Sequence, residues 1–251
     1  MADATLPLTA SLPLWETRLR LVLGVSALAV GGLMWLLVLL LLLPFRAARA
    51  RWSNRFAQPL ARTLLWLTGS RFVVDGREHL QQSRPVVYVS NHSSLLDILI
   101  AAWLAPVGTV GVGKKEILSY PLVGWLFALS GCLAVDRSQL RNAARGLTRL
   151  AADAHRDDLS VLMWPEGTRS PDGRPRPFKR GFAHLAMLTG YDVVPVVVEG
   201  AHLAWPNKTL QLCPTTVRIT VHPPIRVDDW DEAQLGQHVS DVSSVFKDAN
   251  G

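Results

Sequence analysis

Residues 86–97 read Val-Val-Tyr-Val-Ser-Asn-His-Ser-Ser-Leu-Leu-Asp, a stretch that joins three kinds of local structure. Its first four residues are an uninterrupted apolar run, which is typical of a strand buried on both faces. Asn91, Ser93 and Ser94 favour helix N-termini, and the apolar residues after them fit a helix that enters a core. Strand, polar turn and helix in this order indicate an α/β fold whose chemistry follows a strand end.

The same alternation continues along the chain from about residue 71. Short runs rich in β-branched residues predict strands at 72–74, 86–90, 109–112, 132–135, 160–164, 193–198 and 217–221. Longer stretches predict helices at 95–104, 121–129, 139–154, 181–188 and 231–247. We therefore expect an α/β domain with a mixed, mostly parallel sheet flanked by helices. Pro195 lies inside one predicted strand, which indicates a bulge or a strand margin there.

The second decisive feature is a charge-free stretch of 23 residues, Leu21 to Leu43. A helix of this length spans ~34 Å, enough for a hydrocarbon core of about 30 Å. The stretch is longer than the apolar part of a secretory signal and ends in Leu-Pro-Phe-Arg, so we expect an uncleaved N-terminal membrane-anchoring helix. The expected division is an anchor, residues 1–50, and a catalytic domain, residues 51–251.

Basic residues around the stretch predict how the anchor is oriented. Two arginines precede it, whereas five follow it, which places the body in the cytoplasm, on the cytoplasmic face of the cell inner membrane. An alternative stays open, a hairpin that enters the membrane and returns, because Gly31-Gly32 could break the helix. Either arrangement puts the body on a membrane.

Composition narrows the class of protein. The chain has 251 residues, 49% of them hydrophobic, and a net charge of +6. This charge fits nucleic acid, an anionic membrane surface or a phosphorylated substrate, and the apolar stretch favours the membrane over nucleic acid. Two cysteines, Cys132 and Cys213, are too few for a disulfide framework or a thiolate zinc site.

His92 and Asp97 are the candidate catalytic pair. Residues five apart lie on different faces of a helix, so the two side chains can meet only if His92 is in the turn and Asp97 in the first helical turn. A carboxylate that accepts from one imidazole nitrogen leaves the other as a base for a hydroxyl proton. Taken alone, the pair also fits a capping histidine and an aspartate attracted by the helix dipole.

Motifs further along the chain favour the catalytic interpretation. Four blocks occur in order: Asn-His-Ser-Ser-Leu-Leu-Asp at 91–97, Lys-Glu at 115–116 with Asp-Arg at 136–137, Pro-Glu-Gly-Thr-Arg-Ser at 165–170 with Phe-Lys-Arg-Gly at 178–181, and Val-Pro-Val at 194–196. In these blocks the sequence resembles the glycerophospholipid acyltransferase family, best known for the 1-acylglycerol-3-phosphate acyltransferases. The resemblance covers about half of the chain.

The third block begins a basic loop. Residues 166–181 hold five cations and two acids, an arrangement suited to a phosphate or to anionic lipid headgroups. The resemblance implies that this block binds the phosphate of the acceptor, and it assigns that role to Glu166, Gly167, Thr168 and Arg169. It implies the same role for Arg137 and, more weakly, for Lys179.

The resemblance also implies the reaction. We expect transfer of a fatty acyl group from an acyl thioester, acyl-CoA or acyl carrier protein, to the free hydroxyl of 1-acylglycerol 3-phosphate, with phosphatidic acid as product. His92 would deprotonate that hydroxyl and Asp97 would hold His92, with no metal, cofactor or protein nucleophile. Two alternatives stay open: another lysolipid acceptor, such as a lyso-ornithine lipid or a lysophospholipid with a larger headgroup, and a catalytically dead lipid-binding protein.

Overall fold

The computed structural model describes residues 11–136 and 140–248 and contains one sheet with the strand order β1-β7-β6-β2-β5-β3-β4. The strands are β1 (Arg71–Asp75), β2 (Val87–Ser90), β3 (Thr109–Lys114), β4 (Leu133–Val135), β5 (Ser160–Met163), β6 (Val193–Glu199) and β7 (Thr216–Val221). All seven predicted strands are present. Every pairing is parallel except that of β6 with β7, which confirms the expected mixed, mostly parallel sheet.

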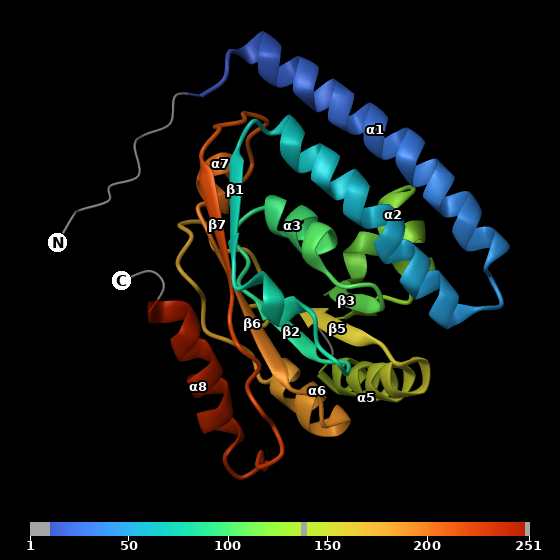
Figure 1. Cartoon of the computed structure of the whole chain (residues 1–251), viewed down its shortest axis with the longest axis vertical. Coiled ribbons are helices and arrows are strands. Elements are labelled where there is room, and N and C mark those ends of the chain that lie inside the picture. Colours follow the sequence, from blue (N-terminus) through green and yellow to red (C-terminus); the bar gives the residue numbers. More distant parts are fainter. Residues whose placement is uncertain (1–10, 137–139, 249–251) are drawn as a thin grey trace.

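Helices cover both faces of this sheet (Figure 1). They are α1 (Leu14–Leu41), α2 (Arg46–Leu67), α3 (Leu96–Leu104), α4 (Val123–Leu129), α5 (Leu140–Asp157), α6 (Gly181–Thr189), α7 (Ala201–Ala204) and α8 (Leu235–Asp248), with 3-10 turns η1 (Arg77–Leu80) and η2 (Lys115–Ser119). One core joins the sheet to α3, α7 and the end of α2, and the other joins it to α5, α6 and α8. Helices α2 and α7 were not among the predicted elements.

The carboxyl ends of five strands lie along one edge of the sheet. Strands β6, β2, β5, β3 and β4 are successive parallel neighbours, so the segments that follow them emerge on the same side. The motif at 91–97 follows β2, at the centre of this edge, and the motif at 165–170 follows the adjacent β5. Crevices outside such carboxyl ends are where open α/β sheets bind their ligands.

Pro195 lies where β6 changes its pairing. Val193 pairs with Ile225 on the β7 side, and the regular antiparallel ladder begins at Val196, which pairs with Val221. Three residues of the partner segment therefore oppose two residues of β6, as in a β-bulge. The proline predicted a bulge or a strand margin, and the irregularity found here is a bulge whose extra residue lies in the partner segment, where the proline carbonyl accepts the N–H of His222.

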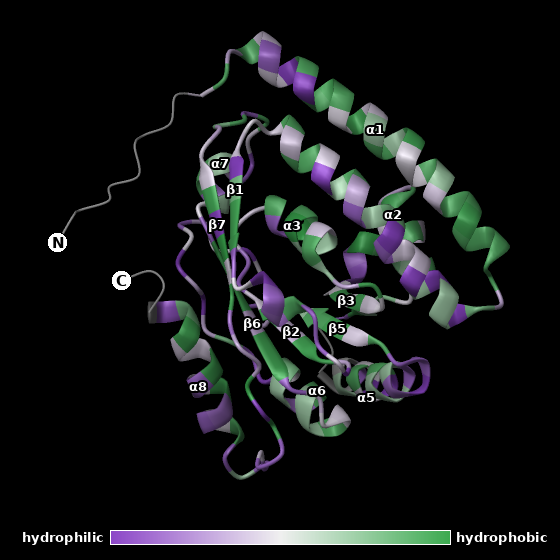
Figure 2. Cartoon of the chain, in the orientation of Figure 1, coloured by the Kyte–Doolittle hydropathy of each residue, from purple (hydrophilic) through white to green (hydrophobic). Residues whose placement is uncertain are grey.

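Helices α1 and α2 form an antiparallel hairpin on one side of the molecule (Figure 1). Gly31 does not break α1; its missing side chain lets Leu60 of α2 approach, since a Cβ would lie 3.2 Å from a Leu60 methyl. Trp35 Nε1 of α1 donates to Ser53 Oγ of α2 (3.2 Å). The most apolar 18-residue window of α1 has a mean hydropathy of 2.3, and 11% of that window is buried; among the described residues α1 is the one helix long and apolar enough to cross a membrane. Figure 2 shows hydrophobic residues, coloured green, along most of α1.

Helix α2 runs without interruption through residue 50, and its polar side chains attach it to the body. The Asn54 amide donates to the Thr109 carbonyl (3.0 Å), and its oxygen accepts the N–H groups of Gly108 and Thr109. Arg49 donates to the Leu129 carbonyl at the end of α4 (2.8 Å). Arg46 forms ion pairs with acidic residues in the last turns of α5, where a cation also complements the helix dipole.

Candidate functional site

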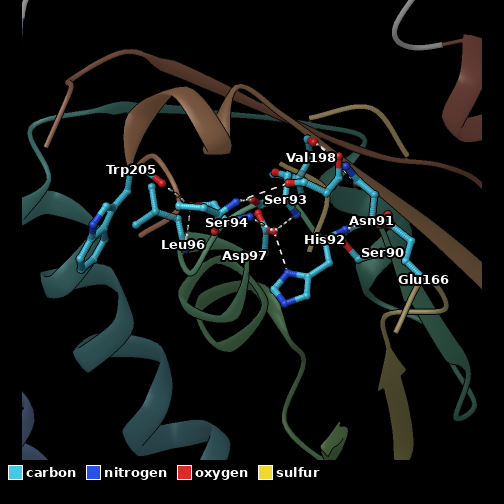
Figure 3. Close-up of polar contacts among 12 residues, drawn as sticks. Ser90, Asn91, His92, Ser93, Ser94, Leu96, Asp97, Glu166, Val198 and Trp205 are labelled. Atoms are coloured by element: carbon cyan, nitrogen blue, oxygen red, sulfur yellow. Dashed lines mark hydrogen bonds and ion pairs between the residues drawn. The ribbon is translucent and has the colours of Figure 1, made fainter. Parts of the chain in front are cut away.

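The centre of the site is the side-chain pair of His92 and Asp97 (Figure 3). Asp97 is the second residue of α3, and His92 lies in the turn before it, so the imidazole Nδ1 is 2.9 Å from Asp97 Oδ2. The same oxygen accepts the backbone N–H groups of Ser93 (2.5 Å) and Ser94 (2.8 Å). The Asp97 side chain is 1% exposed and that of His92 is 15% exposed. The carboxylate is therefore fixed by its neighbours, and the second imidazole nitrogen, Nε2, is left available as a base.

Asn91 fixes the turn to the sheet. Its amide nitrogen donates to the Val198 carbonyl (2.8 Å), and its oxygen accepts the Val198 N–H (2.8 Å). The side chain thus bonds to β6 as a neighbouring strand would, at the point where β2 has ended. Asn91 is a positioning residue for His92; the motif contains it, but the sequence gives no sign of this partner.

Trp164 and Asn207 complete the surroundings of the pair. The Trp164 ring, at the end of β5, stacks on the His92 ring with centroids 5.1 Å apart and an interplanar angle of 29°. Asn207 donates to the Ser93 carbonyl (2.8 Å), and the Ser170 N–H donates to the His92 carbonyl (2.7 Å). Sequence reasoning missed Trp164 and Asn207, and only the place of Trp164 directly before the block at 165–170 could have indicated it.

Glu166 lies against the turn that contains His92. Its Oε1 accepts the backbone N–H of His92 (3.0 Å), and the side chain is buried. Burial raises the pKa of the Glu166 carboxyl to about 7, with a smaller contribution from the Asp97 charge, although the N–H groups of His92 and Arg176 oppose the shift. Glu166 contacts the backbone of the turn, a position suited to holding His92 in place.

The pKa of Glu166 predicts a pH-dependent stability. The folded-state pKa is above the ordinary value of 4.5, so the folded protein loses stability as the pH rises from about 4.5 through 7. A Glu166→Gln variant keeps an acceptor for His92 and carries no charge. We expect its melting temperature to exceed that of the wild type at pH 8, with a smaller difference at pH 5.

Thermal unfolding in detergent at the two pH values measures this difference. Glu232→Gln removes an exposed carboxyl and serves as the control. A Glu166→Gln effect of equal size at both pH values would contradict the raised pKa.

The other predicted binding residues that the structure describes lie at or near the surface. Gly167 has φ +73°, and a Cβ on it would lie 3.0 Å from Lys179 Nζ, so the lysine side chain covers this backbone. Thr168, Arg169 and Lys179 are exposed, and within the described residues the guanidinium of Arg169 has no ion-pair or hydrogen-bond partner. Arg137 lies outside the described residues. The structure thus brings this block against the turn at His92 through Glu166 and Ser170, and it places Lys179 over Gly167.

A buried carboxylate that orients a histidine at the carboxyl edge of a parallel sheet is suited to activating a hydroxyl group. Residues 71–199 match the model of the family described as Acyltransferase, and the chain belongs to that family. The resemblance expected from the four motif blocks is thereby confirmed.

Named relatives share most of the chain. It is 35% identical over 238 residues to a 1-acyl-sn-glycerol-3-phosphate acyltransferase of Cocos nucifera, covering 93% of this chain and 77% of the relative. The enzyme of that name from Pseudomonas aeruginosa is 31% identical over 84% of this chain and 82% of its own length. The crystal structure of the 1-acyl-sn-glycerophosphate (LPA) acyltransferase PlsC from Thermotoga maritima superposes with a TM-score of 0.68 at 24% identity, covering 88% of this chain and 95% of that one. This likeness shows that the fold is shared.

Proposed function

We propose that the protein transfers a fatty acyl group from an acyl thioester to the free hydroxyl of 1-acylglycerol 3-phosphate, which yields phosphatidic acid. The observation that carries the proposal is the His92–Asp97 pair next to the start of the basic loop 166–181, where the Glu166 carboxylate accepts the His92 backbone N–H. The names of relatives from plants and bacteria support this acceptor.

The test is an assay of the purified protein against a panel of lysolipids, with acyl-CoA and acyl carrier protein as separate donors. Formation of phosphatidic acid at the highest rate is the expected result. A faster reaction with a lyso-ornithine lipid or a larger-headgroup lysophospholipid would identify that lipid as the acceptor in place of 1-acylglycerol 3-phosphate. Absence of product from every lysolipid would overturn the enzymatic proposal.

The proposed reaction needs one proton shuttle. His92 Nε2 accepts the proton of the acceptor hydroxyl while Asp97 holds Nδ1–H and stabilises the imidazolium. The hydroxyl oxygen bonds to the thioester carbonyl carbon, and the carbon–sulfur bond then breaks. The departing thiolate takes the proton from His92, so the base is ready for another cycle.

Arg169 is the proposed anchor for the acceptor phosphate, with Thr168, Gly167 and Lys179 around it. A planar guanidinium binds phosphate through two hydrogen bonds, and an exposed Arg169 without a partner among the described residues is free to do so. Arg137 is proposed as a second phosphate contact from the resemblance alone. Glu166 is buried, so we propose that it has no direct contact with the acceptor and instead holds the turn at His92 in the shape that acceptor binding needs.

Arg169→Ala separates binding from chemistry. Loss of a charged hydrogen bond weakens binding of the acceptor by ~1.5 to 3 kcal/mol and does not affect binding of the donor. The KM of the acceptor should therefore rise about tenfold or more while the donor KM changes little. Arg180→Ala removes the same charge from another exposed position of the loop and should leave both constants nearly unchanged. Equal increases in the two KM values after Arg169→Ala would indicate a structural role.

We propose that the body lies on the cytoplasmic membrane through α1, with the catalytic domain in the cytoplasm. Helix α1 is continuous through Gly31-Gly32, so the break that would form a hairpin within 21–43 is absent, but contacts at the start of α1 favour a helix that stays beside the body over a span that leaves it. Leu12 N–H, just before α1, donates to the Leu212 carbonyl (3.2 Å), and Arg20 donates to the Leu67 carbonyl at the end of α2 (3.2 Å). The division into residues 1–50 and 51–251 stays a prediction, which limited proteolysis would test.

Accessibility of an N-terminal cysteine distinguishes the two arrangements. In sealed, inside-out vesicles a Ser11→Cys variant should react with a membrane-impermeant maleimide, since the start of α1 stays beside the cytoplasmic body. A cysteine at an exposed position of the catalytic body, Leu188→Cys, should react equally and serves as the control. Protection of the thiol at position 11 until the vesicles are opened would support the span.

A further inference from the structure

The segment 118–125 exposes four large apolar side chains next to the membrane helix. Leu118, Tyr120, Val123 and Trp125 lie on η2, the following turn and α4, and the exposed fractions of Tyr120 and Trp125 are 57% and 59%. We call these four residues the 118–125 patch. A soluble surface seldom concentrates apolar side chains in this way unless something covers them.

The 118–125 patch adjoins the lipid-facing surface of α1. The opposite side of α4 packs on α1, where a Cβ on Gly32 would lie 2.9 Å from a Leu122 methyl and 3.4 Å from one of Leu126. The residues of α1 beyond this contact, Leu33, Met34 and Leu37 among them, are exposed. The apolar surface therefore continues from α1 onto a segment 80 or more residues away in the sequence.

The 118–125 patch also lies close to the functional edge of the sheet. It follows β3, whose carboxyl end shares that edge with the turn at 91–97. Lys114 and Lys115 precede it and are exposed, and Lys115 Nζ is 2.8 Å from Asp136 Oδ2 after β4. Because Lys115 is paired with Asp136, the exposed Lys114 is the cation at this border that is placed for an anionic headgroup.

From these observations we infer that the 118–125 patch is a second membrane-contacting element that inserts into the lipid surface beside α1. Together, the two elements hold the carboxyl edge of the sheet at the bilayer, where a lysolipid acceptor resides. Tyr and Trp suit this depth because their rings combine an apolar body with a polar tip. The inference rests on the membrane attachment proposed above for α1.

Depth-dependent quenching tests the inference without any assay of activity. Single cysteines are placed at 125, at 30 on the exposed face of α1, and at 188 on α6 in the opposite layer, in a chain with Cys132→Ser and Cys213→Ser. Each is labelled with an environment-sensitive fluorophore and bound to vesicles of phosphatidylcholine and phosphatidylglycerol that carry nitroxide on their acyl chains. We expect quenching at 30 and at 125, and none at 188.

The outcomes separate the patch from the anchor. Quenching at 30 with no quenching at 125, as at 188, would overturn the inference. That result would still support membrane attachment through α1. A shielded but unquenched probe at 125 would assign the patch to a protein partner or a second copy of the chain, which also overturns it. Absence of quenching at both 30 and 125 would refute the membrane attachment itself.

A matched pair of variants tests the consequence for function. Tyr120→Asp with Trp125→Asp should lower turnover of lysolipid in vesicles by about tenfold, because a charge in the interface opposes insertion. Turnover of a dispersed short-chain lysolipid should stay within about twofold, since that substrate needs no bilayer. Leu188→Asp changes a side chain that is 52% exposed on α6 and should affect neither rate. Equal losses on both substrates would show a structural role and contradict the inference.

Discussion

A His92→Ala variant should lose at least about 100-fold, and up to about 10,000-fold, in kcat, the range that a positioned general base contributes. The fold should survive, because the contacts of His92 with Glu166 and Ser170 run through its backbone N–H and carbonyl. The measurement is the rate of phosphatidic acid formation at saturating donor and acceptor. KM values near those of the wild type would show that substrates still bind.

The matched control for this variant is His155→Ala. His155 is exposed on α5 and packs against the Tyr191 ring, at the edge of the sheet where β5 begins, opposite the site. Its replacement should leave kcat unchanged. If His92→Ala kept more than about a tenth of the wild-type rate, general-base catalysis by His92 would be excluded.

Asp97→Asn has the second-largest expected effect, a fall in kcat of about 100-fold or more with little change in either KM. Asn can accept the hydrogen bonds of the turn, but it carries no charge to stabilise the imidazolium that forms when His92 takes the proton. The control is Asp192→Asn, another buried carboxylate, which pairs with Arg84 (2.6 Å) at the start of β6. That change should lower the melting temperature and leave kcat near the wild-type value.

Such a split would assign Asp97 to catalysis. An Asp97→Asn variant that behaves like Asp192→Asn, with a lower melting temperature and a kcat near the wild-type value, would assign Asp97 to the fold. The comparison is informative because both carboxylates are almost fully buried and each has a cationic or ionisable partner.

The strands and the His92–Asp97 contact could be predicted because short stretches of sequence determine them. The strands carry β-branched runs, and the spacing of His92 and Asp97 allows contact only in a turn followed by a helix, as found. Helix α2 was not predicted because its contacts are with residues far away in the sequence. Its arginines resembled the basic flank of a membrane span, whereas Arg49 contacts the carbonyl of a residue 80 positions away and Arg46 pairs with acidic residues more than 100 positions away.

In the site, too, contacts between distant segments could not be predicted from the sequence. The motif contains His92 and Asp97, but the stack of Trp164 on His92 and the bond from Asn207 to Ser93 depend on how distant loops meet at the sheet edge. The burial of Glu166 is also invisible in a sequence, where its block appears uniformly suited to binding phosphate. Tertiary packing, not residue type, separates Glu166 from the exposed Arg169.

The attachment of α2 to the body has a thermodynamic consequence. Through Asn54, Arg46 and Arg49, α2 shares polar contacts with β3, α5 and α4, and on its other side it packs against α1. The lipid-facing helix and the catalytic sheet should therefore open together as one cooperative unit in hydrogen exchange. A bilayer that binds this native arrangement then acts as a ligand of the folded state, so lipid should slow amide exchange even in strands that it never touches.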